Sequence, residues 1–128
     1  MTTAHLCIAL AIWIPYLGTT IAKAGGRGYG VRANHEPRDF LAALSGFRKR
    51  AHAAQLNGFE VTPAFAAAVL TAQQVGSAPQ ATIDALALGF IGCRLVYTLC
   101  YVADWASLRT AVWFASMASV VALFWVSA

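Results

Sequence analysis

The sequence predicts an all-α integral membrane protein built as a bundle of four helices. Apolar residues make up 59% of the 128 residues and charged residues only 11%, whereas about 25% is usual for soluble domains. The mean hydropathy is +0.63. Three apolar segments approach or exceed the roughly 20 residues that cross a bilayer, and a fourth, more polar segment has the length of a helix. We expect a single membrane domain over residues 1–128.

The first helix is expected at about residues 4–22. A cleaved signal peptide is the alternative, because Ala22-Lys23-Ala24 resembles a cleavage site. The region before the apolar run contains no Lys or Arg, however, and the run is long for a signal peptide. We therefore expect this helix to be retained in the protein.

Basic residues concentrate in the segment that follows the first helix. Seven of the nine Lys and Arg residues lie between positions 23 and 50: Lys23, Arg27, Arg32, Arg38, Arg48, Lys49 and Arg50. This clustering is typical of a cytoplasmic connection and explains the net charge of +4 better than nucleic-acid binding does. We expect residues 25–39 to form a loop on the cytoplasmic side, with both chain termini on the other side.

Three further helices are expected at about 39–74, 80–103 and 108–127. Pro37 lies near the start of the second helix, where its missing N–H is tolerated. Gly76, Ser77 and Pro79 predict a short turn between the second and third helices. A short connection at 104–107 precedes the fourth helix.

Polar residues line one side of the second and third helices. At about 100° per residue, one stripe contains Arg50, Ala53, Asn57 and Glu60, and the other contains Arg94, Tyr97, Thr98, Tyr101 and Asp104. Unpaired burial of such groups costs several kcal/mol, so they need partners.

The tight turn makes these two helices antiparallel, so residues equally far from Ser77 lie at similar depth. Glu60 and Arg94 each lie seventeen residues from Ser77, and Arg50 and Asp104 each lie twenty-seven. We expect Glu60 to be the counter-ion of Arg94. One interpretation is a structural ion pair within a helical hairpin. The other is a polar cavity for a ligand with carboxylates, lined by Arg50, Asn57, Tyr97, Tyr101 and Arg109.

Other motifs carry less information. Cys7, Cys93 and Cys100 lie in apolar runs without paired or metal-ligand spacing, and we interpret them as packing residues. Gly89 with Cys93, and Ala115 with Ser119, have the small-xxx-small spacing of packed membrane helices. The sequence contains no Ser-His-Asp set, Walker loop or zinc motif, and no metal site is predicted.

Three runs resemble the MAPEG family, the membrane-associated proteins of eicosanoid and glutathione metabolism. They are Arg50-x₆-Asn57-Gly-Phe-Glu60, then Arg94-x₆-Tyr101, then Leu108-Arg109-Thr110. The resemblance extends from about residue 4 to the C-terminus. It implies a four-helix bundle that assembles as a homotrimer and binds glutathione between neighbouring subunits near the cytoplasmic face.

The resemblance also implies roles for individual residues. The expected glutathione site contains Arg50, Asn57, Glu60, Arg94 and Tyr101, with Tyr97 on the same stripe, and Arg109 resembles the arginine that stabilises the glutathione thiolate. The chain departs from some members at Ala53, Gln55 and Trp113, where those members have arginine, histidine and tyrosine. It is more similar to a bacterial member, which implies the bacterial inner membrane.

The expected function is therefore that of a membrane-bound glutathione transferase or peroxidase. Its co-substrate is glutathione, and its second substrate is a hydrophobic electrophile or lipid that arrives from the bilayer. The alternative is a non-catalytic membrane protein whose buried polar stripe stabilises the oligomer. A small transporter is a third possibility, but the first and fourth helices are too apolar to line a polar path.

Overall fold

The fold consists of helices joined by short turns. The computed structural model describes residues 1–24 and 28–128, so the predicted loop residues 25–27 lie outside the described part of the chain. The helices are α1 (Thr3–Ala24), α2 (Val31–His35), α3 (Pro37–Ala42), α4 (Gly46–Val75), α5 (Gln80–Ala103) and α6 (Ala106–Trp125). The predicted all-α fold is confirmed.

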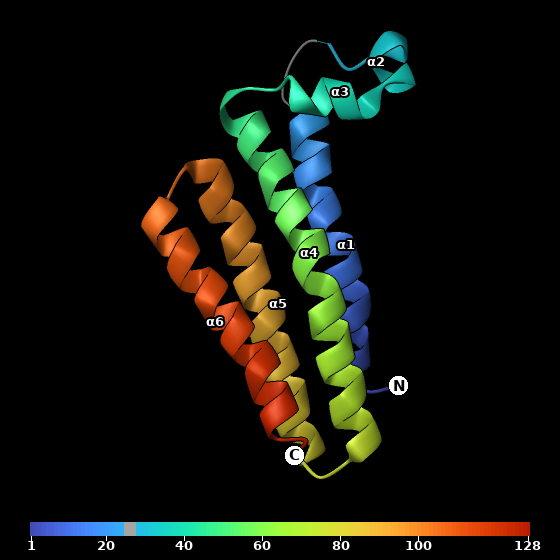
Figure 1. The fold of residues 1–128 in the computed structure, drawn as a ribbon, viewed down its shortest axis with the longest axis vertical. Coiled ribbons are helices and arrows are strands. Elements are labelled where there is room, and N and C mark those ends of the chain that lie inside the picture. Colours follow the sequence, from blue (N-terminus) through green and yellow to red (C-terminus); the bar gives the residue numbers. More distant parts are fainter. Residues whose placement is uncertain (25–27) are drawn as a thin grey trace.

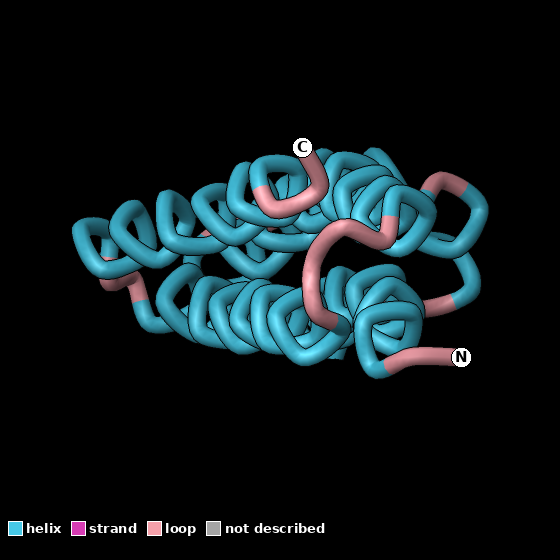
Figure 2. The backbone as a smooth tube through the Cα atoms, turned by 90° about the horizontal axis from the view of Figure 1, so that it is seen from below, coloured by secondary structure: helices cyan, strands magenta, loops and turns pink. Residues whose placement is uncertain are grey.

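The four long helices lie side by side, and their ends carry different segments. The two termini and the α4–α5 turn lie at one end, whereas α2, α3 and the α5–α6 connection lie at the other (Figure 1). Helices α4 and α5 each contact the other three long helices, while α1 packs mainly on α4 and α6 packs mainly on α5. Viewed from the end with the termini, the helices form two rows that the 76–79 turn connects (Figure 2).

Three of these helices are long and apolar enough to cross a membrane: α1, α5 and α6. Helix α4 is longer, at 30 residues, but it carries the polar residues of the first predicted stripe. The apolar core between the helices contains the stacked rings of Phe65 and Phe90, whose centroids are 3.9 Å apart. This contact joins α4 to α5 in the middle of the bundle.

Helices α1 and α4 approach closely because glycine lies at the contact points. A Cβ atom at Gly58 would lie 2.6 Å from Cγ of Pro15, and one at Gly18 would lie 2.5 Å from the carbonyl oxygen of Ala51. Pro15 has no N–H, so the carbonyl of Ala11 loses its usual helical donor. The hydroxyl of Thr62 lies 3.2 Å from that carbonyl and 2.8 Å from the Gly58 carbonyl. We call this contact the α1–α4 seam.

The predicted helix at 39–74 is wrong in its first part. The chain forms α3, leaves helical geometry at residues 43–45 and starts α4 at Gly46. Ser45 is extended, and Gly46 has φ +59°, a left-handed conformation that favours glycine. The predicted loop at 25–39 also contains α2. Because of this break, α3 lies across the end of the bundle instead of extending α4 (Figure 1).

Candidate functional site

Arg94 of α5 is a buried cation with few partners. Its side chain is 4% exposed. Nη2 donates to Oδ1 of Asn57 at 3.0 Å, and the guanidinium carbon lies 4.1 Å from the centroid of the Tyr97 ring. Nη1 is buried and has no hydrogen-bond partner among the described residues. A buried guanidinium with an unpaired donor is costly to the folded chain and can accept an anionic ligand.

The predicted ion pair between Glu60 and Arg94 is wrong. Asn57 lies between them, because its Nδ2 donates to Oε2 of Glu60 at 3.2 Å while its Oδ1 accepts from Arg94. Glu60 is exposed on the outside of α4. Equal distance from the turn fixes depth along the bundle but not rotation about the helix axis. Glu60 is rotated about 60° from Asn57, away from the contact with α5.

Two arginines and two tyrosines form a continuous row at this level. The rings of Tyr97 and Tyr101 meet edge to face, with centroids 5.2 Å apart. The guanidinium carbon of Arg109, on α6, lies 4.4 Å from the centroid of Tyr101, as Arg94 lies over Tyr97. We call Arg94, Tyr97, Tyr101 and Arg109 the cation–tyrosine row. It brings together four of the predicted site residues from two helices.

Arg50 contacts the end of α5 rather than the row. Its Nε donates to the Tyr101 carbonyl and its Nη2 to the Val102 carbonyl, each at 3.1 Å. Its Nη1 lies 3.7 Å from Oδ2 of Asp104, which is the ion pair found within the described residues. The equal spacing from Ser77 predicted a similar depth for these two residues but not an ion pair. Arg50 therefore satisfies free carbonyls at a helix C-terminus, where a cation is also favourable.

The sequence interpretation missed two features of this region. Arg48 donates from Nε to the Ala22 carbonyl at 2.7 Å and so performs for α1 what Arg50 performs for α5. The ring faces of Tyr97 and Tyr101 also support cations, a role that the sequence interpretation did not include. The three-residue spacing of Arg94 and Tyr97 could have indicated their contact, because residues three apart are neighbours on the surface of a helix.

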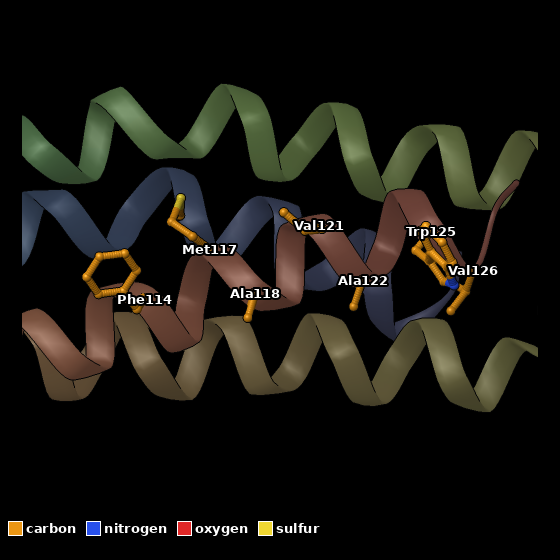
Figure 3. Close-up of a pocket in the computed structure, with 7 residues that line it drawn as sticks. All are labelled: Phe114, Met117, Ala118, Val121, Ala122, Trp125 and Val126. Atoms are coloured by element: carbon orange, nitrogen blue, oxygen red, sulfur yellow. The ribbon is translucent and has the colours of Figure 1, made fainter.

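The row is distinct from a cavity of about 500 Å³ along the outer face of α6. Figure 3 shows its lining residues, all from α6 and the residue that follows it: Phe114, Met117, Ala118, Val121, Ala122, Trp125 and Val126. None of them is charged, and none is a predicted site residue. This cavity therefore offers no charged partner to a ligand with carboxylates, whereas the row contains two guanidiniums.

The fold and the row together define an all-helical integral membrane protein with two guanidiniums held on aromatic rings. A family model, the MAPEG family, matches residues 3–128, and the chain therefore belongs to this family. The predicted resemblance is thus confirmed over essentially the whole chain. No curated protein and no solved structure matches the chain.

Proposed function

We propose that the protein is a membrane-bound enzyme that uses the glutathione thiolate to conjugate or reduce hydrophobic electrophiles. The observation that carries the proposal is the buried guanidinium of Arg94, whose Nη1 has no partner among the described residues. Members of the MAPEG family generally use glutathione, which supports this choice of ligand.

The charge pattern of the region matches glutathione, which has two carboxylates and one ammonium group. Arg94 and Arg109 offer donors for carboxylate and thiolate groups, and charge-assisted pairs of this kind are among the stronger hydrogen bonds. Glu60, held by Asn57, is the acceptor for the ammonium group. Tyr97 and Tyr101 hold the two guanidiniums and leave their edges for the ligand.

Arg109 is the proposed activating residue. A free thiol has a pKa of about 8.5 and is only about 3% ionised at pH 7. A guanidinium against the sulfur lowers that pKa by about two, which makes the thiolate the major form. The position of Arg109 on the Tyr101 ring, half-buried beside the α5–α6 connection, supports this role.

The proposed assembly is a homotrimer of four-helix subunits, in which α4 crosses the membrane with α1, α5 and α6. Glu60 lies near the middle of α4 and is exposed in the single chain. An ionisable residue exposed at membrane depth is costly, so a neighbouring subunit that covers it supports the proposal. The ligand would then lie between subunits, with Glu60 and the row on its two sides.

The proposed location is the bacterial inner membrane, with the α2–α3 end in the cytoplasm and both termini outside. The observation that supports this orientation is the concentration of seven of the nine basic residues between positions 23 and 50. Glutathione would then reach the row from the cytoplasmic side, where Arg109 and Tyr101 lie.

A hydrophobic co-substrate is supported by an apolar groove at the same level. A cavity of about 430 Å³ lies between α1 and α5, lined by Leu17, Thr20, Ile21, Leu95, Thr98 and Leu99. Thr98 donates its hydroxyl to the Arg94 carbonyl, so the groove offers little polarity. Its position on the same turns of α5 as Tyr97 and Tyr101 favours a substrate that arrives from the acyl chains.

One observation favours the alternative of a non-catalytic protein. Arg50, a predicted glutathione ligand, is already bound to two carbonyls of α5 and to Asp104. A polar stripe that only joins helices would show such contacts throughout. In the row, Nη1 of Arg94 has no partner among the described residues, as is also true of Nη2 of Arg48 outside the row, but Arg94 is the more deeply buried of the two.

Calorimetry with glutathione on the purified protein in detergent tests the proposal. The parent is expected to bind, and Arg94→Met is expected to bind about 10- to 100-fold more weakly, because hydrogen bonds to charged groups contribute about 1.5–3 kcal/mol. Arg32→Ala removes the same charge from the exposed surface of α2 and is expected to bind like the parent. A parent that does not bind glutathione, or equal losses in both variants, would contradict the proposal.

A further inference from the structure

Arg50 of α4 holds the end of α5 through three separate contacts. Its Nε donates to the Tyr101 carbonyl and its Nη2 to the Val102 carbonyl, each at 3.1 Å, while Nη1 lies 3.7 Å from Oδ2 of Asp104. Every nitrogen of the guanidinium is therefore in contact with the last turn of α5 or with the residue after it. These contacts oppose the direct glutathione contact that the family resemblance implies for Arg50.

The segment that Arg50 holds determines where α6 begins. Asp104 has φ +65°, a left-handed conformation that costs energy for a residue with a side chain. The Trp105 amide donates to the Cys100 carbonyl at 2.9 Å, and the Arg109 amide donates to the Trp105 carbonyl at 2.9 Å. Only two residues separate α5 from α6. A displacement at the end of α5 is therefore passed directly to the first turn of α6.

That first turn carries Arg109, the proposed activating residue. Its guanidinium carbon lies 4.4 Å from the centroid of the Tyr101 ring, and the carbonyl of the same tyrosine accepts from Arg50. Tyr101 thus presents its backbone to one arginine and its ring to the other. The cation–π contact weakens as the cation leaves the ring, and the effect of a guanidinium on a thiol falls with distance. The thiol pKa therefore depends on how firmly the end of α5 is held.

We propose that Arg50 is a positioning residue, which holds the α5–α6 connection so that the Arg109 guanidinium stays on the Tyr101 ring beside the bound thiolate. The inference rests on the proposed function for its effect on glutathione, whereas the contacts themselves exist without a ligand. Arg48 makes the same kind of contact at another helix end. Its Nε donates to the Ala22 carbonyl of α1 at 2.7 Å, and α1 carries no residue of the row. Arg48 is therefore the matched control.

The ultraviolet titration of bound glutathione separates positioning from direct binding. Arg50→Met is expected to bind glutathione within about twofold of the parent but to raise the thiol pKa by about one, because Arg109 is no longer held in place. Arg48→Met is expected to leave both values unchanged. Arg50→Lys should fall between Arg50→Met and the parent, since an ammonium keeps the charge but not the planar fork. An unchanged thiol pKa in Arg50→Met would overturn the inference, and a loss of affinity of about tenfold beside it would identify a direct ligand.

Fluorine NMR of the ligand-free protein tests the same contact without glutathione. With 3-fluorotyrosine at position 101, Arg109→Ala is expected to move the fluorine resonance, because the cation leaves the ring. Arg50→Met should move it in the same direction, and Arg48→Met should not move it. If Arg50→Met does not fold, Asp104→Asn takes its place. That change removes the ion pair at an exposed position, keeps a residue that tolerates the left-handed turn, and should give a smaller shift in the same direction.

The two measurements distinguish failure of the inference from failure of the proposed function. A parent that binds no glutathione but shows these fluorine shifts would contradict the proposed function alone. A resonance that moves in neither Arg50→Met nor Asp104→Asn, or that moves equally in Arg48→Met, would overturn the inference.

Discussion

The α1–α4 seam and the cation–tyrosine row are both packed polar contacts between helices, but they differ in how completely their polar groups are paired. In the seam, the carbonyl that Pro15 leaves without a helical donor has the Thr62 hydroxyl beside it, and Gly58 removes any gap. In the row, Arg94 has one side-chain hydrogen bond, and its Nη1 has no partner among the described residues.

This difference separates stability from binding. An unsatisfied buried donor costs about 1–3 kcal/mol, so a contact that served only to hold helices together would be better without Arg94. In the seam, the Thr62 hydroxyl donates to the carbonyls of Ala11 and Gly58, so neither that hydroxyl nor the Ala11 carbonyl is left without a partner. We infer that the seam holds α1 and α4 rigidly together, while the row offers a donor that the described residues do not use.

The largest expected effect concerns the seam. Gly58→Leu should destabilise the protein by about 3 kcal/mol, because its Cβ alone would lie 2.6 Å from a rigid proline ring. The free energy of unfolding in mixed micelles measures this. Gly92→Leu is the matched control, since Gly92 is exposed on α5 and a Cβ there meets nothing within 4 Å. Equal stability of the two variants would show that the seam is not closely packed.

The next effect concerns the partner of Arg94. A double-mutant cycle between Arg94→Met and Asn57→Ala should give a coupling of about 1.5–3 kcal/mol, the range for hydrogen bonds to a charged group. The cycle between Arg94→Met and Glu60→Gln should give less than about 0.5 kcal/mol, because these side chains are not in contact. A larger coupling of Arg94 to Glu60 than to Asn57 would support the ion pair predicted from the spacing and would contradict the structure.

A smaller effect tests whether the seam needs its hydroxyl. Thr62→Val keeps the shape but removes the donor to the Ala11 carbonyl, and it should cost about 1 kcal/mol of unfolding free energy. Thr20→Val is the control, since the Thr20 hydroxyl donates to the Tyr16 carbonyl within its own exposed turn. We expect that control to change stability by less than about 0.5 kcal/mol. Similar losses in both variants would indicate that the Ala11 carbonyl needs no added donor.

Much of the fold could be predicted from the sequence, because hydrophobic length determines it. Apolar runs near the bilayer length predicted α1, α5 and α6 to within about two residues. The break before α4 was missed, since it depends on Gly46 adopting a positive φ, and glycine alone does not reveal its conformation. The proline–glycine seam was missed for a similar reason: it requires knowing which faces of two helices meet.

The sequence predicted which residues belong to the candidate site better than it predicted the contacts between them. The spacing from Ser77 predicted that Arg50 and Asp104 lie at similar depth, and the two side chains do form an ion pair. It failed for Glu60, because depth carries no information on rotation about the helix. The support of Arg94 and Arg109 by tyrosine rings could not be read from the residue types, since the same tyrosines could have offered their hydroxyls instead.

The central claim is that the row holds glutathione as a thiolate, with Arg109 as the activating group. An ultraviolet titration of glutathione bound to the protein tests it most directly, because thiolate absorbance reports ionisation of the sulfur. We expect the parent to show thiolate near neutral pH, with the thiol pKa about two below its free value of about 8.5. Arg109→Ala should still bind glutathione through Arg94 and Asn57, with a thiol that ionises as it does in water. A parent with an unshifted thiol, or a variant that titrates like the parent, would contradict the account.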